Sequence, residues 1–178
     1  MALVDTDRAV SLYEALQGGV EMSGGSAANT MCGIASFGGR AAYIGKVAQD
    51  ALGDTFSKDM QVVGVDFKRP ASGNSVPTGR CIIAVTPDAQ RTMNTFLGIS
   101  SLLTPADLDA AAIAAGAVLY LEGYLYDQPE AKVAFRAAAE IAHKHNRQVS
   151  LTLSDSFCVD RHRSDFRALI SDEIDILF

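Results

Sequence analysis

The sequence predicts an α/β fold in which helices flank a parallel β-sheet. In the second half of the chain, apolar strand-like stretches alternate with amphipathic helical stretches. Strands separated by helices at this spacing are typical of right-handed β-α-β crossovers and therefore of parallel pairing. The stretch from Ala117 to Leu121 is also apolar throughout, as expected of a strand buried on both faces of such a sheet.

The bulk composition is that of an ordinary globular protein. The chain has 178 residues, of which 48% are hydrophobic and 20% charged, enough for one domain with a real core. A net charge of −6 and the lack of a basic run argue against a nucleic-acid-binding surface. We find no secretory signal in the opening residues and no apolar run of membrane-spanning length. The three widely spaced cysteines, Cys32, Cys81 and Cys158, indicate reduced thiols and a cytoplasmic protein.

The first half of the chain begins with an amphipathic helix. Residues Ala9, Leu12, Tyr13 and Leu16 share one of its faces, and residues 17–19 are expected to end it. The predicted elements up to residue 67 are helices at 5–16, 27–37 and 50–63, a short strand at 20–22, and strands at 41–47 and 65–67.

A β-hairpin is predicted to interrupt this α/β pattern. After a loop at 70–74, two alternating stretches at 75–86 and 90–97 flank the connection 87–89. A polar hairpin inserted between α/β units is typical of a flap over a site, so we expect a lid at about 75–98.

The second half begins with a well-marked helix start. Thr104 is a hydroxyl N-cap, Pro105 occupies the first helical position, and Asp107 is the acid of the first turn. The predicted elements that follow are helices at 104–115, 129–145 and 161–170, and strands at 117–121, 148–153 and 174–178.

A glycine-rich segment lies just before the helix at 27–37. Gly24 and Gly25 can take positive φ values and let a ligand approach the main chain. The N–H groups at the start of the next helix would point toward that ligand, and Asn29 would offer it both a donor and an acceptor. A glycine turn before a buried helix is an equally good interpretation of this segment alone.

The spacing of several motifs resembles the amino-terminal signature of the ribokinase-like kinases, the PfkB family. The matching motifs are GGSAAN, the small-residue helix, FGG, the strand at 41–47 and DALG. Met31 and Ala48 depart from the pattern, where a small residue and a glycine are usual. The resemblance implies that Gly24, Gly25 and Asn29 hold sugar hydroxyls of the phosphoryl acceptor. It also implies that residues 1–178 form the amino-terminal portion of one incomplete, three-layer domain.

The second hairpin strand carries a possible ligand-binding face. Alternation places Arg91, Met93 and Thr95 on one side of it. By itself this pattern favours an exposed edge strand with an arginine on its solvent-exposed face. However, the segment PTGRC and the strand pair beyond it resemble the lid of adenosine kinases. The resemblance implies that Arg91 closes over the phosphates as a clamp and that Met93 and Thr95 cover the adenine.

Ligands of parallel α/β sheets bind beyond the carboxyl ends of the strands. Two such ends are Glu122-Gly123-Tyr124 and Ser154-Asp155-Ser156. The resemblance implies that Tyr124 lies beside the base, although a plain surface tyrosine is as good an interpretation. An Asp-Ser pair after a strand is more typical of a helix cap. His143 and His145 suit a helix end and His162 the surface, and no spacing predicts a metal site.

The resemblance implies an ATP-dependent kinase that phosphorylates the CH2OH group of a nucleoside or sugar, most like adenosine kinase. In the family, an Asn-x-x-Glu segment that organises Mg2+ and a Gly-Ala-Gly-Asp element that supplies the base are expected beyond Phe178. An early strand with an acidic residue is also expected, and no such strand precedes the helix at 5–16. We therefore expect the acceptor-binding half, with most ATP and Mg2+ elements absent and no turnover alone.

Three alternatives to this interpretation stay open. The protein could be a ribokinase- or fructokinase-like sugar kinase. It could be a non-catalytic module that binds a nucleoside or a sugar. A dinucleotide-binding protein is a weaker alternative, because GGSAAN is not the G-x-G-x-x-G fingerprint. The sequence does not determine the oligomeric state.

Overall fold

The fold is described from a computed structural model, which covers residues 2–16, 19–70 and 75–178. The helices are α1 (Thr6–Ala15), α2 (Ser26–Ser36), α3 (Ala51–Val63), α4 (Ala110–Ala115), α5 (Pro129–Lys144) and α6 (Ser156–Glu173). The strands are β1 (Ala2–Leu3), β2 (Ala41–Tyr43), β3 (Val65–Phe67), β4 (Arg80–Val85), β5 (Arg91–Phe96), β6 (Val118–Glu122), β7 (Gln148–Thr152) and β8 (Ile176–Leu177). Short 3-10 helices are η1 (Gly98–Leu102), η2 (Pro105–Asp107) and η3 (Gly123–Asp127).

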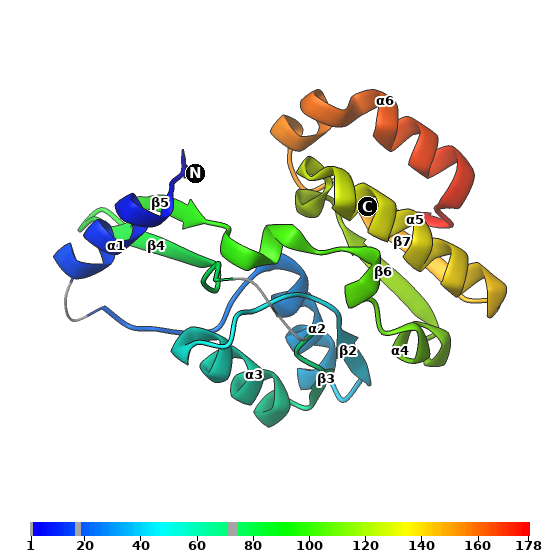
Figure 1. Cartoon of the computed structure of the whole chain (residues 1–178), viewed down its shortest axis with the longest axis horizontal. Helices are drawn as coiled ribbons and strands as arrows, with labels where there is room; N and C mark the ends of the chain where they lie inside the picture. Colours follow the sequence, from blue (N-terminus) through cyan, green and yellow to red (C-terminus); the bar gives the residue numbers. More distant parts are fainter. Residues whose placement is uncertain (1, 17–18, 71–74) are drawn as a thin grey trace.

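The chain forms three groups of elements along the long axis of the molecule (Figure 1). The hairpin β4-β5 and α1 lie at one end, and β6, β7, α4, α5 and α6 lie at the other. Helices α2 and α3 with strands β2 and β3 lie between them. Each group contains its own cluster of buried apolar side chains.

The hairpin is part of a three-stranded sheet with the order β1-β5-β4. Strands β4 and β5 are antiparallel and β1 pairs parallel to β5, so the predicted hairpin is confirmed, with a first strand that begins at Arg80 and not at residue 75. Helix α1, capped by the Asp5 side chain, covers one face of this sheet. Ala9 packs there against Ile82 and Phe96. The opposite face is not covered by α1.

The middle group is a parallel pair, β2-β3, packed against α2 and α3. Its core holds Tyr43, Phe56 and Phe67, whose ring centroids are 5.3–5.7 Å apart. Helix α3 ends at Gly64, which has a left-handed conformation with φ 86°, as predicted. This group positions the glycine-rich segment, because α2 begins directly after it.

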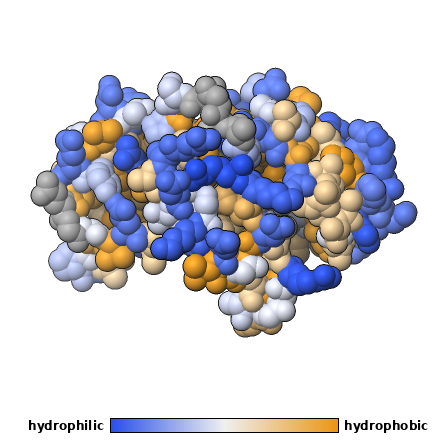
Figure 2. Space-filling model, turned by 60° about the horizontal axis from the view of Figure 1, so that its bottom comes forward, coloured by the Kyte–Doolittle hydropathy of each residue, from blue (hydrophilic) through white to orange (hydrophobic). Residues whose placement is uncertain are grey.

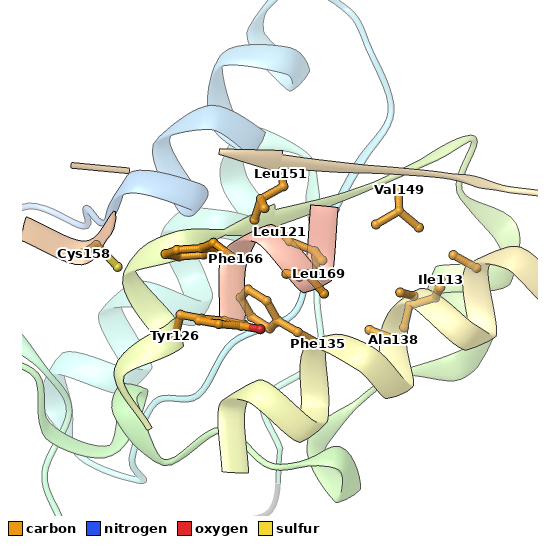
Figure 3. Packing of buried hydrophobic residues seen from close by; sticks show 12 residues of the cluster. Ile113, Leu121, Tyr126, Phe135, Ala138, Val149, Leu151, Cys158, Phe166 and Leu169 are labelled. Atoms are coloured by element: carbon orange, nitrogen blue, oxygen red, sulfur yellow. The ribbon is translucent and has the colours of Figure 1, made fainter. Parts of the chain in front are cut away.

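The third group is a parallel sheet with the order β6-β7-β8, covered by α5 and α6. Figure 3 shows its core, in which the rings of Tyr126 and Phe166 stack with centroids 4.6 Å apart. Phe135 packs against Tyr126 at 5.6 Å. The large aromatic and aliphatic side chains come from η3, α4, α5, α6 and strands β6 and β7, so this core fixes the sheet against its helices.

Parallel pairing is confirmed, but the strands do not join into a single sheet. The pair β2-β3 and the trio β6-β7-β8 are separate, although Ile44 packs against the core of the larger sheet. A short strand that was not predicted precedes α1. It is β1, which is exposed and belongs to the hairpin sheet, so it is not the buried acidic strand of the family pattern.

Several predicted boundaries are wrong for local reasons. The helix at 104–115 is broken into η2 and α4, because Asp109 caps a new helix by accepting from the N–H of Ala112. Helix α6 begins at Ser156, earlier than predicted, because Asp155 caps it, and it is kinked at His162. Residues 20–22 form no strand. Residues 17–18 and 71–74, where a helix end and a loop were predicted, lie outside the described residues.

The surface view in Figure 2 shows polar and charged residues across the middle of one face, with apolar residues in smaller separate patches. Tyr13 and Leu16, predicted to share one face of the first helix with Ala9 and Leu12, are 47% and 42% exposed. None of the helices described has the length and apolar character needed to span a membrane.

Candidate functional site

The glycine-rich segment forms an open approach to the start of α2. Gly25 is the N-cap of that helix with φ 112°, a conformation that residues with a side chain rarely adopt. A side chain at Gly24 would meet no atom within 4 Å, so the space beside it is open. The first N–H groups of a helix have no acceptor within the helix and carry its positive dipole end. The predicted helix start is therefore confirmed, and it can receive a polar ligand.

Two serines hold this segment in place from both sides. Ser23 Oγ donates a hydrogen bond of 2.6 Å to Asp59 Oδ2 on α3. Ser26 Oγ donates a hydrogen bond of 2.5 Å to Glu122 Oε2 at the end of β6. Gly24 and Gly25 lie between these two attachments, which come from different groups of the fold. The backbone that would contact a ligand is therefore fixed before the ligand arrives.

Glu122 is a buried carboxylate surrounded by hydroxyl groups. The residue is 7% exposed. Ser26, Ser154 and Tyr120 donate hydrogen bonds to it, the last at 3.3 Å. These donors are neutral, and no lysine, arginine or histidine of the described residues forms an ion pair with Glu122, so hydroxyl groups solvate its charge. Burial, together with the negative charge of Glu122, raises the pKa of Tyr43 to about 12.

The carboxyl ends of β6 and β7 meet at this carboxylate. Ser154 has a left-handed backbone with φ 68°, which is strained for a residue other than glycine. Its hydroxyl donates to Glu122 Oε1. A side chain at Gly123 would collide with the carbonyl oxygen of Thr152, so the two strand ends approach closely. The left-handed conformation of Ser154 and the close approach of the two strand ends place the Ser154 hydroxyl against the Glu122 carboxylate.

Tyr124 and Asp155 lie beside the same strand ends. Tyr124 is 42% exposed, within η3. Burial of part of its ring, followed by the charge of Asp155, raises the pKa of its phenol. Asp155 caps α6 by accepting from the N–H of Cys158 at 2.8 Å, so the predicted helix cap at this position is confirmed. An exposed ring next to a buried carboxylate gives a ligand both an apolar surface and a polar contact.

Arg91, Met93 and Thr95 occupy one face of β5. Their cross-strand partners in β4 are Val85, Ile83 and Cys81, which share that face. It is the face opposite α1, and Arg91 on it is exposed. Thr95 Oγ1 donates to Cys81 Sγ at 3.2 Å.

The structure brings some of the predicted site residues together and not others. Gly24, Gly25 and Asn29 lie on one helix start, and Asn29 is exposed one turn along α2. Glu122 and Tyr124 lie at the strand end that this helix start contacts through Ser26. No hydrogen bond in the described chain joins the face of Arg91, Met93 and Thr95 to Gly24, Gly25 or Asn29.

The roles of Glu122, Ser26 and Ser154 were missed by sequence reasoning. The available signal was the position of Glu122 as the one charged residue at the end of an apolar strand of a parallel sheet. The surface placement of His162 was wrong. Its side chain is 15% exposed and its Nε2 lies 2.6 Å from Asp127 Oδ1.

Comparison with known proteins gives three findings. Residues 4–178 match the family model described as pfkB family carbohydrate kinase. The crystal structure of a probable sugar kinase from Rhizobium etli CFN 42 has 48% sequence identity and a TM-score of 0.91, with 100% of this chain and 54% of that chain covered. The adenosine kinase from Sinorhizobium meliloti has 51% identity and a TM-score of 0.90, with 100% and 55% covered.

More distant relatives show the same pattern of coverage. Fructokinase-2 from Solanum habrochaites is 27% identical over 141 residues, which are 78% of this chain and 43% of that protein. The chain therefore spans about half the length of the relatives that it matches.

Proposed function

The chain belongs to the pfkB family of carbohydrate kinases, and we propose that it carries the acceptor-binding half of an ATP-dependent kinase that phosphorylates the CH2OH group of a nucleoside or sugar. The observation that carries this proposal is the contact between Ser26 and Glu122. It joins a helix start with an open glycine approach to a buried carboxylate at the end of a parallel strand. Both features suit a ligand with several hydroxyl groups.

The groups at this site would share the recognition of a sugar ring. The N–H groups at the start of α2 and the Asn29 amide would donate to ring hydroxyl oxygens. Glu122 would accept from ring hydroxyls, in place of some of the bonds it now receives from serine hydroxyls. A hydrogen bond to a charged group is stronger than one between neutral groups, so Glu122 would contribute most to selecting a hydroxylated ligand.

A nucleoside is the acceptor that the surrounding residues favour. Tyr124 presents an exposed ring beside Glu122, where a base could stack. Met93 and Thr95 lie on the hairpin face opposite α1. This face would cover the base, and Arg91 on the same face would clamp the phosphates. The 51% identity to an adenosine kinase supports this choice. A free sugar is the second candidate, supported by the 48% identity to a probable sugar kinase.

Among residues 2–16, 19–70 and 75–178, no group of three or more histidine, cysteine, aspartate or glutamate side chains gathers to hold a metal ion. ATP and Mg2+ are implied by the family. The chemistry assigned to this chain's own residues is acceptor binding and orientation.

Calorimetric titration tests the proposal directly. Adenosine, ribose and fructose are titrated separately into the chain, and the Asn29→Ala variant serves as the site control. We expect saturable binding of adenosine that weakens in the variant, and weaker or no binding of the free sugars. Binding of a free sugar in preference to adenosine would support the second candidate. Absence of binding by all three compounds would contradict the proposal.

A further inference from the structure

The hairpin sheet is attached to the rest of the molecule through a buried polar junction. Thr78 lies just before β4 and is 6% exposed. Its Oγ1 donates to Asp50 Oδ1 at 2.7 Å, and its N–H donates to Asp50 Oδ2 at 2.9 Å. The same Oγ1 accepts from the N–H of Ala48 at 2.9 Å. One threonine thus uses its side chain and its backbone to bind the loop between β2 and α3.

Asp50 does more here than cap a helix. A capping aspartate needs only to accept from an N–H group of the first turn. Asp50 does this for α3 by accepting from the N–H of Gly53 at 2.8 Å. Its two additional bonds come from Thr78, one to each carboxylate oxygen, so Oδ1 accepts two hydrogen bonds and Oδ2 accepts one. The start of α3 and the root of the hairpin therefore share one carboxylate.

The backbones that enter and leave the hairpin cross at the same place. Gly98 has a left-handed conformation with φ 54°, and a side chain there would collide with the carbonyl oxygen of Pro77. A side chain at Gly79 would likewise collide with the carbonyl oxygen of Leu97. The N–H of Ile99 donates to the carbonyl of Pro77 at 3.0 Å. The crossing leaves little room for the two segments to slide past each other.

The loop that holds Thr78 is fixed on its other side by a buried ion pair. Lys46 is 9% exposed, and its Nζ lies 2.7 Å from Asp107 Oδ2. The same Nζ donates to the carbonyl of Leu102 at 3.2 Å. The loop between β2 and α3 is thus bound to the hairpin root and to the segment that follows the hairpin. It provides a fixed base from which the hairpin projects.

We infer that Asp50 and Thr78 are positioning residues for acceptor binding. They fix the direction in which the hairpin leaves the body, and so the location of the face that carries Arg91, Met93 and Thr95. Neither residue is among the groups proposed to contact the acceptor; each acts through the hairpin. This inference rests on the proposed function for its effect on binding, but the anchoring of the hairpin is independent of any ligand.

The anchoring is tested by hydrogen exchange of the ligand-free chain. Thr78→Val keeps the shape of the side chain and removes its hydroxyl, and we expect the amides of β4 and β5 to exchange about tenfold faster while β6 and β7 are unchanged. Thr78→Ser should restore slow exchange. Asp109→Asn is the matched control, because Asp109 caps α4 outside the hairpin. If Thr78→Val does not fold, Asp50→Asn takes its place.

The positioning role is tested by titration with adenosine in a double-mutant cycle. We expect Thr78→Val to weaken binding at least fivefold in the wild-type background and to have no further effect in the Met93→Ala background. Unchanged exchange in the hairpin, equally faster exchange throughout the chain, or the same loss of affinity in both backgrounds would overturn the inference. If the wild-type chain binds neither adenosine nor a free sugar, the proposed function fails, and hairpin exchange alone decides the inference.

Discussion

Ser26 and Glu122, separated by 96 residues in the sequence, are joined by a hydrogen bond of 2.5 Å from the serine hydroxyl to the carboxylate. The bond connects the start of α2 to the carboxyl end of β6. It therefore unites two features that sequence reasoning treated separately, the glycine-rich segment and the strand end.

Glu122→Gln should weaken adenosine binding about tenfold, which corresponds to roughly 1.4 kcal/mol. The glutamine amide has the shape of the carboxylate but no charge. Its NH2 group, a hydrogen-bond donor, replaces one carboxylate oxygen and would face hydroxyl groups that also donate. Calorimetric titration measures the loss. Glu130→Gln, an exposed glutamate in the first turn of α5, is the matched control and should bind adenosine as the wild type does. Equal affinities for all three proteins would remove Glu122 from the site.

Asn29→Ala should weaken acceptor binding by roughly 1–3 kcal/mol, because a hydrogen bond buried by the ligand is lost. The side chain is exposed in the ligand-free chain, so the substitution should leave the free energy of unfolding within about 0.5 kcal/mol of the wild-type value. Urea denaturation checks the stability and titration checks the affinity. Unchanged affinity in a folded variant would show that Asn29 does not contact the acceptor.

Arg91→Ala should reduce affinity for AMP more than affinity for adenosine. The guanidinium would pair with a phosphate group and not with the nucleoside, so only the phosphorylated ligand loses a charged partner. Arg167→Ala, an exposed arginine of α6, controls for the change in net charge. Equal losses for AMP and adenosine would contradict the assignment of Arg91 as a phosphate clamp.

The attachment of the hairpin through Thr78 and Asp50 should weaken at acidic pH, because the Asp50 carboxylate becomes protonated. Burial alone would raise the pKa of this carboxyl, but hydrogen bonds from Thr78 and Gly53 outweigh it and lower the pKa below its ordinary value of 3.8. A carboxyl whose pKa is lower in the folded state contributes stability that is fully present at pH values above its ordinary pKa. This contribution is lost as the pH falls through the pKa of the folded state. Amide exchange of β4 and β5, corrected for intrinsic rates, should therefore accelerate below about pH 4. Asp50→Asn should abolish this acceleration.

Phe166→Ala should destabilise the chain by about 3–5 kcal/mol. The side chain is 2% exposed and stacks on Tyr126, so its removal leaves a cavity in the largest core. Phe157→Ala, on the same helix but 71% exposed, should change the free energy of unfolding by less than about 0.5 kcal/mol. Urea denaturation of the two variants distinguishes the positions, and similar losses would contradict the packing in Figure 3.

Local patterns in the sequence predicted most elements of the fold. Gly64 ended α3 and the hairpin around residues 87–89 formed, because such signals act over a few residues. The break between η2 and α4 was not predicted, since Pro105 and Asp109 begin two competing helices that look like one. The separation of β2-β3 from β6-β7-β8 depends on long-range pairing, which no local pattern specifies.

The candidate site was predicted only where a motif marks it. Gly24, Gly25 and Asn29 were found because glycines before a helix are a recognisable pattern. Glu122 was placed at a strand end, but its three hydroxyl donors come from α2, β6 and the segment that follows β7. That convergence depends on tertiary packing, and so does the attachment of Thr78 to Asp50, which joins residues 28 positions apart.

Titration of adenosine into wild-type chain, Asn29→Ala and Glu122→Gln tests the central claim most directly. We expect saturable binding to the wild type, weaker binding to both variants, and no requirement for ATP. A parallel titration with NAD should show no saturable binding, because the dinucleotide fingerprint is absent. Failure of the wild type to bind adenosine or a free sugar, or saturable binding of NAD, would contradict the assignment of this chain as the acceptor-binding half of a kinase.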